Sequence, residues 1–596
     1  MLDLPIFHSR DAGYRRPFGA LPRGTAMDIT FMPPRIWGAL RVMLVAEIEE
    51  SGEVFEIQLE WQEHKRDRDV YVGSLSTNGI LGLVWYHFRI ERGINPPLFY
   101  GQQAHCKGGE GCLSDLPVGY QLTVYDGKAY MPDWYGKGLT YHIFADRFAQ
   151  GNVAPAGDFP RTLHTNWNAT PTFAPTEEGI VLNNDFFGGN LAGILEKLDY
   201  IESLGVKTIF LSPIFEAASN HRYDTGDYLK IDPLLGDEDD FQELCKVCET
   251  RGIRVMLDGV FNHAGYDSRY FNGYSNYDEV GAYQSKDSRY FDWFHFDNWP
   301  DEYASWWGIL ILPKLNVNNP DLRKFLLDGK DSVVRKWLNL GASGWRLDVV
   351  DEVPDDFVAQ LRRSAQTEKK DAVVIGEVWE DASNKIAYSV RRRYFWGDEL
   401  DGVMNYPLRN ALLAYVLGGS AHDFVADMEC LRENYPRFAY YNLMNALGTH
   451  DTPRILTVLG SDPTAYHATK AERADVKLSP QQRELAIKRL KIATLILYCF
   501  PGSPCLYYGD EAGSEGYEDP LNRRTYPWGR EDNELIAWHR ELGELRNKNA
   551  ALQEGGIEYH DCTDNVLCFT RMLGSKHVTV RVDNRTYEYS YEHTRL

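Results

Sequence analysis

The sequence predicts an α/β protein built around a closed barrel of eight parallel strands and eight helices. From about residue 137 onward, short apolar strand-like segments alternate with segments of helical periodicity, which is typical of βαβ units and a parallel sheet. The strand-like segments number eight, as a closed (β/α)8 barrel needs. An open doubly wound sheet is the alternative. It would normally have a glycine-rich phosphate turn after its first strand, and none is visible.

The predicted strands follow one another along the chain, each with an apolar centre. They are LTYHIFADRF (139–148), VKTIFLSPIF (206–215), IRVMLDGVFNH (253–263), GWRLDVV (344–350), AVVIGEVW (372–379), DGVMNYP (401–407), MNALGTHD (444–451) and CLYYGDEAG (505–513). Between the first two, residues 191–205 have one apolar helical face and end in a glycine, which predicts a helix.

Changes in residue pattern divide the chain into three predicted domains. Residues 1–132 contain short alternating segments rich in β-branched and aromatic residues, which predicts an N-terminal β-sandwich. Residues 133–540 hold the barrel, interrupted after its third strand by an irregular inserted domain, residues 264–341. This insertion is rich in aromatic residues. Residues 541–596 return to a strand pattern and predict a short C-terminal β domain.

Composition limits the partners and the compartment. A net charge of −23 argues against a nucleic-acid partner, which would need a basic face. No stretch approaches the roughly 18 apolar residues of a membrane span, and residues 1–19 lack the apolar run of a signal peptide. The nine cysteines are scattered and odd in number, which fits a reducing compartment. We therefore expect a soluble, cytoplasmic protein without a membrane partner.

Two groups of cysteines resemble metal or redox motifs. Cys245 and Cys248 form a CxxC, but they share one helical face with Phe241 and Leu244, so core packing explains them better. The segment QQAHCKGGEGC (102–112) offers metal-ligating side chains, although a loop is the preferred interpretation.

Polar and charged side chains end several of the apolar strands. They are Asp258, Asn262 and His263 after the third strand, Arg346 and Asp348 in the fourth, Glu377 after the fifth, and His450 and Asp451 after the seventh. In a (β/α)8 barrel the C-terminal strand ends form the active site, so these side chains are expected to converge. A single Asp or His at a strand end is often a helix cap, but the whole set is hard to explain without a function.

Arg346 and Asp348 lie two residues apart and therefore on one face of a buried strand. A buried charge is costly unless it is paired or used. We expect the arginine to keep the aspartate ionised.

These residue types favour glycoside hydrolysis. No serine or cysteine stands in a GxSxG-like context, and no HExxH metal motif occurs. Carboxylate pairs suit glycoside hydrolysis, in which one carboxyl protonates the leaving oxygen while the other attacks the sugar or activates water. Residues 266–307 contain fifteen Tyr, Phe or Trp, whose rings can stack on sugars or pack the insertion.

Six motifs occur in a fixed order along the barrel segment. They are HRYDTGDYLKIDP (221–233), DGVFNH (258–263), LPKLN (312–316), GWRLDVVDEV (344–353), GEVW (376–379) and GTHDTPR (448–454). In these motifs, over roughly residues 137–540, the sequence resembles the α-amylase superfamily of TIM-barrel glycoside hydrolases. It most resembles the neopullulanase, cyclomaltodextrinase and maltogenic-amylase group.

The resemblance implies roles for individual residues. Asp348 is the implied nucleophile, Glu377 the general acid/base, and Asp451 the carboxylate that stabilises the transition state. The implied substrate-binding residues are Tyr223, His263, Arg346, Trp379, His450, Asp519 and Arg523. No cofactor is expected to be required. Calcium is a candidate, with Asn262 as a ligand, and residues 145–152 resemble a calcium loop.

The implied function is retaining hydrolysis of α-1,4-glucosidic bonds in maltodextrins, cyclodextrins or pullulan. An α-amylase, an α-glucosidase or an α-1,6-cleaving pullulanase on the same scaffold are alternatives. Val350 and Asp351 replace the Ala-Asn pair usual in the group, which leaves open the preference between α-1,4 and α-1,6 bonds and between hydrolysis and transglycosylation. A catalytically silent glucan-binding protein is the alternative from another class. In relatives the N-terminal β-domain often helps to build a dimer, so a homodimer is an expectation, and carbohydrate binding is a candidate role for this domain.

Overall fold

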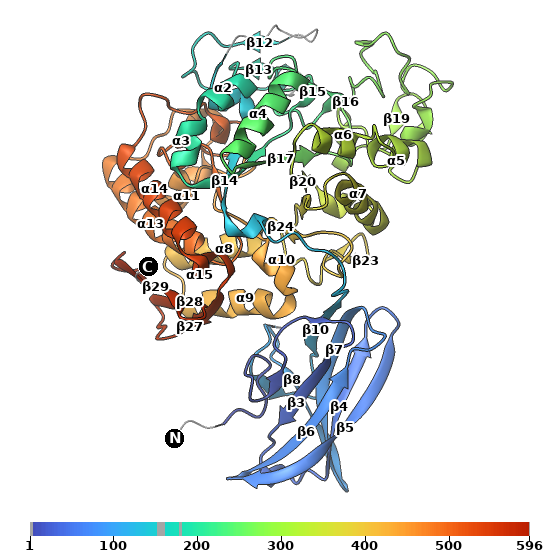
Figure 1. Ribbon diagram of the computed structural model, residues 1–596, viewed down its shortest axis with the longest axis vertical. Coiled ribbons are helices and arrows are strands. Elements are labelled where there is room, and N and C mark those ends of the chain that lie inside the picture. Colours follow the sequence, from blue (N-terminus) through green and yellow to red (C-terminus); the bar gives the residue numbers. More distant parts are fainter. Residues whose placement is uncertain (1–3, 106, 152–160, 178–180, 595–596) are drawn as a thin grey trace. The chain divides into compact units, whose positions relative to one another are not determined.

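The computed structural model describes residues 4–105, 107–151, 161–177 and 181–594 (Figure 1). Cys106 and Asn152, which belong to the predicted loops at 102–112 and 145–152, lie outside the described residues. The chain forms two compact units. The first unit comprises Met1–Met131, Glu380–Asp401 and Asp423–Tyr440, and the barrel unit comprises Pro132–Trp379, Gly402–His422 and Tyr441–Leu596.

The barrel unit contains eight parallel strands in one sheet. They are β11 (Leu139–Ile143), β14 (Val206–Leu211), β17 (Arg254–Gly259), β20 (Gly344–Leu347), β21 (Val373–Gly376), β24 (Gly402–Val403), β25 (Met444–Ala446) and β26 (Ser503–Tyr507). Their order in the sheet is β24-β21-β20-β17-β14-β11-β26-β25. A parallel bridge between Met404 and Met444 joins the two ends of that order and closes the ring. Each strand overlaps a predicted segment, and the predicted (β/α)8 barrel is confirmed.

Helices follow the strands, as the alternating pattern predicted. Those of the barrel unit are α1 (Ala145–Phe148), α2 (Leu191–Glu196), α3 (Leu198–Ser203), α4 (Glu238–Thr250), α5 (Pro320–Leu326), α6 (Val333–Asn339), α7 (Asp355–Glu368), α8 (Tyr406–Val416), α11 (Ile455–Gly460), α12 (Lys470–Ala474), α13 (Pro480–Cys499), α14 (Asn533–Lys548) and α15 (Ala550–Glu554). The predicted helix at 191–205 is two short helices, α2 and α3, which meet at Lys197. Cys245 and Cys248 lie buried in α4, as core packing predicted.

The chain between β17 and α5 is irregular, as expected, whereas α5 and α6 occupy the last part of the predicted insertion, residues 264–341. Before α5 its short elements are η3 (Phe291–Trp293), β18 (Phe296–Asn298), β19 (Glu302–Tyr303) and η4 (Trp306–Gly308). Aromatic rings pack against one another throughout this insertion; Phe271, for example, contacts the rings of Phe294, Phe296 and Tyr303. Much of the aromatic content therefore stabilises the insertion itself.

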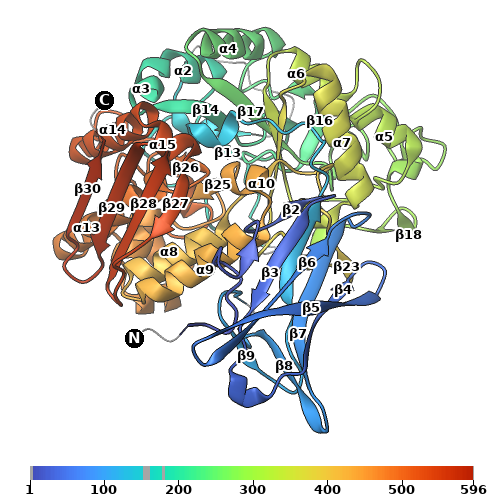
Figure 2. The ribbon, with the colours of Figure 1, turned by 60° about the horizontal axis from the view of Figure 1, so that its bottom comes forward.

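The first unit is a β-sandwich, as predicted. Its strands are β1 (Arg15–Arg16), β2 (Leu21–Pro22), β3 (Ala26–Phe31), β4 (Arg41–Ile48), β5 (Glu53–Lys65), β6 (Arg68–Ser76), β7 (Gly82–Arg92), β8 (Asn95–Gln102), β9 (Gly111–Leu113) and β10 (Tyr120–Tyr125). The long β5 pairs with β4 along one part of its length and with β6 along the other (Figure 2). Phe31 and Leu75 from one half share a core with Leu44 and Phe88 from the other, so the two halves face each other.

The chain ends in a four-stranded antiparallel sheet, visible in Figure 2, which corresponds to the predicted C-terminal β domain. Its strands are β27 (Gly556–Tyr559), β28 (Val566–Leu573), β29 (Lys576–Asp583) and β30 (Tyr589–His593). Within the described part of the chain, no helix combines the length and the apolar composition needed to cross a membrane.

Candidate active site

Arg346 lies at the centre of a buried cluster at the C-terminal ends of β17, β20 and β21. Its Nη1 donates to Asp258 Oδ1 at 2.8 Å and to Asp348 Oδ1 at 2.9 Å. Its Nη2 lies 2.8 Å from Glu377 Oε2. Strand register explains the arrangement, because Asp258 and Arg346 are partners across β17 and β20, and Asp348, directly after β20, lies two residues beyond Arg346. The guanidinium of Arg346 therefore forms ion pairs with the carboxylates of Asp258, Asp348 and Glu377.

The turn after Asp348 is strained and contacts Glu377. Val349 has φ +39° and ψ 51°, the left-handed region that a β-branched residue seldom adopts. Its backbone N–H donates to Glu377 Oε2 at 2.8 Å. Trp379 Nε1 donates to the other oxygen, Oε1, at 3.1 Å, while its ring stacks on Tyr406 with centroids 3.7 Å apart. Both oxygens of Glu377 therefore have a defined donor.

Asp451 lies in a second group of charged side chains, after β25 and β26. Its Oδ2 lies 3.1 Å from His450 Nε2, and its Oδ1 lies 3.6 Å from Arg523 Nη2. Arg523 Nη1 lies 2.9 Å from Asp519 Oδ1, and its Nε donates to the His450 carbonyl at 3.0 Å. The predicted pair Asp519 and Arg523 is therefore an ion pair next to Asp451.

Tyr223 links the two groups. Its hydroxyl donates to Asp258 Oδ2 at 2.8 Å, and its ring stacks on His450 with centroids 4.9 Å apart and planes inclined by 15°. The carboxylates that the sequence assigned to three different strand ends, Asp348, Glu377 and Asp451, therefore belong to one connected set.

Burial and mutual repulsion set the protonation of the carboxylates. Burial raises the pKa of Asp348 well above its usual range, and the neighbouring Glu377 and Asp258 add to the rise, while Arg346 opposes it. Burial likewise raises the pKa of Asp258 to about 6 and raises that of Asp451. Arg346 therefore acts on Asp348 in the expected direction, because it favours the ionised form against the effects of burial and of the other carboxylates.

His263 is fully buried beside the inserted segment. Its ring stacks on Trp306 with centroids 5.4 Å apart, and its Nδ1 lies 3.2 Å from Asn262 Nδ2. Burial lowers the pKa of His263 to about 4, opposed in part by the nearby Tyr223 backbone. Burial and the surrounding cationic groups lower the pKa of His450 well below its usual range. Both imidazoles are therefore neutral near pH 7 and can exchange hydrogen bonds with hydroxyl groups.

The residues present do not make a convincing calcium site. Asn262 Oδ1 is buried without a hydrogen-bond partner among the described residues, but calcium takes about six to eight oxygen ligands. No group of three His, Cys, Asp or Glu side chains suited to a metal was found in the described ranges. In the loop that resembles a calcium loop, Arg147 Nε pairs with Asp146 Oδ2 at 2.7 Å. No step is therefore assigned to calcium.

Two buried residues of the site had no individual role assigned from the sequence. Asp258 was expected only among the converging strand-end side chains, and it accepts hydrogen bonds from both Arg346 and Tyr223. His142, in the middle of β11, is fully buried, and its ring meets that of His450 edge-on with centroids 5.4 Å apart. The signal for both was the one that revealed Arg346, a polar side chain inside an otherwise apolar strand.

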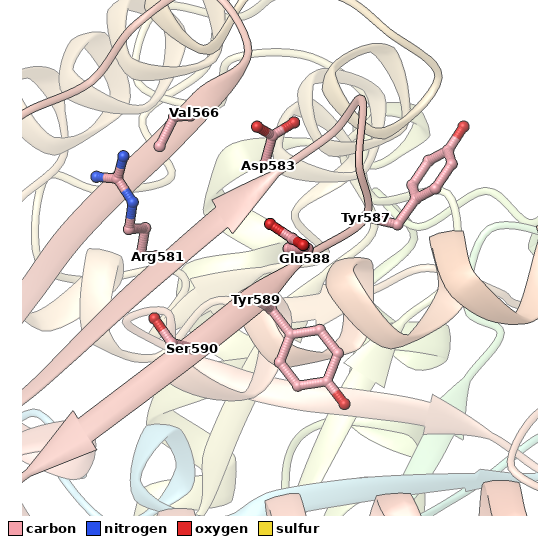
Figure 3. Close-up of a pocket in the computed structure, with 7 residues that line it drawn as sticks. All are labelled: Val566, Arg581, Asp583, Tyr587, Glu588, Tyr589 and Ser590. Carbon is pink, nitrogen blue, oxygen red and sulfur yellow. The ribbon is translucent and has the colours of Figure 1, made fainter.

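A separate hollow of about 610 Å³ lies on the C-terminal sheet (Figure 3). It is lined by Val566, Arg581, Asp583, Tyr587, Glu588, Tyr589 and Ser590. None of the predicted site residues is among them, and the candidate active site remains the set at the barrel strand ends.

Most of the chain is similar to known proteins. The family described as alpha amylase, catalytic domain, matches residues 142–563. An amylopullulanase of Thermoanaerobacter thermohydrosulfuricus is 38% identical over 539 residues, covering 82% of this chain and 35% of its own length. The chain thus spans about a third of that relative. A cyclomaltodextrinase of Geobacillus thermopakistaniensis is 35% identical over 475 residues, covering 76% of this chain and 70% of the relative.

A solved structure extends the similarity to almost the whole chain. The type III pullulan hydrolase of Thermococcus kodakarensis superposes with a TM-score of 0.66 at 26% identity, covering 98% of this chain and 94% of that one. Barrel, insertion and strand-end motifs thus agree with the family match, and the chain belongs to the α-amylase family of glycoside hydrolases.

Proposed function

We propose that the protein hydrolyses α-1,4-glucosidic bonds in maltodextrins, cyclodextrins or pullulan with retention of configuration. The main support for this proposal is the cluster around Arg346. Its guanidinium pairs with both Asp348 and Glu377, and Asp451 lies in the adjoining group of charged side chains. Two carboxyl groups facing one sugar are the minimal apparatus for a double displacement. Their separation is predicted to be about 5–5.5 Å, as in retaining enzymes.

In the first step Asp348 attacks the anomeric carbon. Arg346 Nη1 binds Oδ1 of Asp348, which leaves Oδ2 as the attacking atom. Protonated Glu377 donates its proton to the glycosidic oxygen as the C–O bond breaks, so the leaving sugar departs with a neutral hydroxyl. The product of this step is a glycosyl ester on Asp348 and an ionised Glu377.

In the second step water replaces Asp348. Glu377 takes a proton from the water, whose oxygen attacks the anomeric carbon and releases the Asp348 carboxylate. Arg346 and the Val349 amide stabilise the negative charge as it moves between Asp348 and Glu377. Both carboxylates then have their starting charges, and no cofactor is consumed.

The remaining predicted residues bind the sugar. Tyr223 provides an aromatic platform, the neutral His263 and His450 exchange hydrogen bonds with hydroxyls, and Asp451 binds sugar hydroxyls and stabilises the transition state. Trp379 supports the leaving-group side, and Asp519 with Arg523 grips sugars toward the non-reducing end. Trp379 suits its role because its indole is bound to Glu377 and its side chain is 44% exposed.

Pullulan is the substrate that tests the proposal. Wild-type protein and Asp348→Asn, a near-isosteric variant without the nucleophile, are incubated with pullulan and the products are separated by chromatography. Panose from the wild type, and none from the variant, is the expected result. Starch and maltoheptaose are tested as substrates in the same assay.

The other outcomes select among the alternatives. Maltotriose would mean that α-1,6 bonds are cleaved, a reading favoured by the identity to a protein named amylopullulanase. If the protein degrades starch but does not cleave pullulan, it is a simpler amylase or glucosidase. If no substrate is cleaved, the protein is a glucan-binding protein and the proposal is wrong. A homodimer and a cytoplasmic location stay predictions.

A further inference from the structure

A basic pocket of about 460 Å³ lies beside the start of α13, within the barrel unit. Its lining contains four cationic side chains, Lys477, Arg483, Arg524 and Arg530, and one acidic side chain, Glu515. The chain as a whole has 86 acidic and 63 basic residues, so the pocket has the opposite charge balance to the rest of the protein. A local excess of cations in a concave surface attracts anions.

One of the four cations is neutralised within the protein. Arg483 Nη1 lies 2.7 Å from Glu515 Oε1, and Arg483 Nη2 lies 3.0 Å from Asp532 Oδ2. The second oxygen of Glu515, Oε2, accepts a hydrogen bond from the Leu478 N–H at 3.0 Å. Glu515 is therefore bound to Arg483 and to the backbone, and the other three cations have to be balanced in another way.

Lys477 and Arg530 form no ion pair with any residue that the structure describes. Arg530 Nη2 donates to Asn168 Oδ1, which is a neutral amide oxygen. Although Lys477 lies at the surface, desolvation by the surrounding protein lowers its pKa; the nearby Arg524 and Arg530 lower it further, and Glu515 opposes them. The ammonium group is thus close enough to the two guanidinium groups to be repelled by them.

Arg524 is fixed in position and keeps an unsatisfied donor. Its Nη1 donates to Thr170 Oγ1 at 3.1 Å and its Nη2 donates to the Ala474 carbonyl at 2.6 Å, so both partners are uncharged. Its Nε is buried and has no hydrogen-bond partner among the residues described. A buried donor without a partner is costly unless a ligand completes it, and a guanidinium held by two other bonds loses little freedom when an anion binds.

The remaining features of the pocket suit an organic phosphate. Helix α13 begins between Lys477 and Arg483, so the positive end of its dipole lies beside the pocket. Ala169, Ala512 and Pro527 add apolar surface to the lining. The volume falls in the range of small-molecule sites, about 300–1,000 Å³, and a phosphate group alone fills only part of it.

We propose that this pocket binds a small organic phosphate, a phosphate monoester of a polyol or sugar, with Lys477, Arg524 and Arg530 as its cationic ligands. Near neutral pH the monoester is close to a dianion with three acceptor oxygens, and hydrogen bonds between such oxygens and cationic donors are about twice as strong as neutral ones. The apolar lining contacts the carbon skeleton. None of the lining residues belongs to the active-site set, so the inference goes beyond the proposed function and does not depend on it.

Calorimetric titration of the whole chain with glycerol 3-phosphate tests the site. In about 150 mM NaCl, which screens weak surface binding, we expect a Kd on the order of 0.1 mM. Inorganic phosphate should bind several-fold more weakly, and glycerol should not bind. Equal affinity for inorganic phosphate would assign the pocket to the free ion and overturn an organic ligand. Absence of glycerol 3-phosphate binding at about 10 mM, a hundred times the expected Kd, would overturn the site itself.

Lys477→Gln and Arg530→Gln locate the binding. Each removes one unpaired cation and should weaken glycerol 3-phosphate binding about fivefold, and the double variant should weaken it more than about tenfold. Lys488→Gln is the matched control in α13: Lys488 pairs with Glu484 at 2.7 Å on the exposed face, and its loss should leave the affinity within about twofold.

Thermal unfolding followed by circular dichroism checks that the variants fold, and either single variant suffices if the double variant does not. Wild-type affinity in both single variants would overturn the proposal. Asp348→Asn separates it from the proposed function, because binding in the pocket requires no hydrolysis and should be unchanged there. If the affinity for glycerol 3-phosphate falls in Asp348→Asn but not in Lys477→Gln, the ligand binds at the barrel strand ends and the pocket assignment is wrong.

Discussion

Two buried ionic clusters in this protein have opposite charge balance. In the first unit, Glu433, in helix α9 (Ala421–Asn434), faces two arginines: its Oε1 lies 2.9 Å from Arg15 Nη1 and its Oε2 lies 2.9 Å from Arg10 Nε. In the barrel unit, Arg346 faces the carboxylates of Asp258, Asp348 and Glu377. One cluster has a cation for each oxygen of its single carboxylate; the other has more carboxylates than cations.

This difference separates a structural role from a catalytic one. The carboxylate of Glu433 is saturated with charged donors, and such a group has nothing left to exchange with a ligand. Around Arg346, burial raises the pKa values of Asp258 and Asp348, and the neighbouring carboxylates add to the rise. Perturbed pKa values of this kind are typical of functional sites. The first cluster should therefore matter for stability and the second for activity.

The strongest test of this contrast is Asp348→Asn. We expect kcat on maltoheptaose to fall on the order of 10⁴-fold or more, because the attacking oxygen is replaced by an amide. Thermal stability should stay equal or rise, because one of the mutually repelling carboxylates is neutral. Steady-state kinetics and thermal unfolding followed by circular dichroism measure the two effects. Retention of more than about 1% of kcat would contradict the nucleophile assignment.

Arg346→Gln should change both the rate and its pH dependence. Arg346 lowers the pKa of Asp348 against the effect of burial, so its removal raises that pKa further. At a given acidic pH less Asp348 is then ionised, and the acidic limb of kcat/KM moves to higher pH. The rate at the optimum should fall about 10²- to 10³-fold.

A pH series from 4 to 9, for wild type and variant, measures this effect. Arg346→Lys keeps the charge and should move the acidic limb less than Arg346→Gln does. An acidic limb that stays in place in Arg346→Gln would show that Arg346 does not control the ionisation of Asp348.

Glu433→Gln should affect stability and leave activity alone. The substitution leaves two arginines, one of them 1% exposed, without their anionic partner, and the free energy of unfolding should fall by about 3 kcal/mol. Asp427→Asn is the matched control in the same helix: Asp427 pairs with Lys107 near the surface, and its loss should cost less than about 1 kcal/mol. Urea unfolding compares the three proteins. If the urea concentration at the unfolding midpoint is the same for all three proteins, Glu433 has no structural role.

The smallest effect is expected at the strained turn. Val349→Gly removes a β-branched side chain from a left-handed conformation, and unfolding should require about 1 kcal/mol more or remain unchanged. The looser turn should lower kcat several-fold, because the Val349 amide is bound to Glu377. Val350→Gly, at the next, buried position, should instead destabilise the protein by about 2 kcal/mol or more. If both variants lose stability equally, the turn stores no strain.

The barrel and most of the site could be predicted from residue patterns along the chain. Strand periodicity and helix faces are local properties, so the eight strands and buried Cys245 and Cys248 could be read directly. Because strand ends of a parallel barrel meet at one edge, Arg346, Asp348, Glu377 and Asp451 could be grouped without coordinates. One helical prediction was only partly right: residues 191–205 form two helices rather than one.

The contacts and charge interactions among these groups, by contrast, follow from the folded arrangement of the chain. The partnership of Asp258 with Arg346 and Tyr223 depends on register and on a loop from another strand. The raised pKa of Asp348 follows from the sum of burial and several neighbours, which no local pattern contains. In the insertion, the indole N–H of Trp307 donates to Glu352, a residue 45 positions away. Such effects arise from distances between segments remote in sequence, and those distances exist only once the chain has folded.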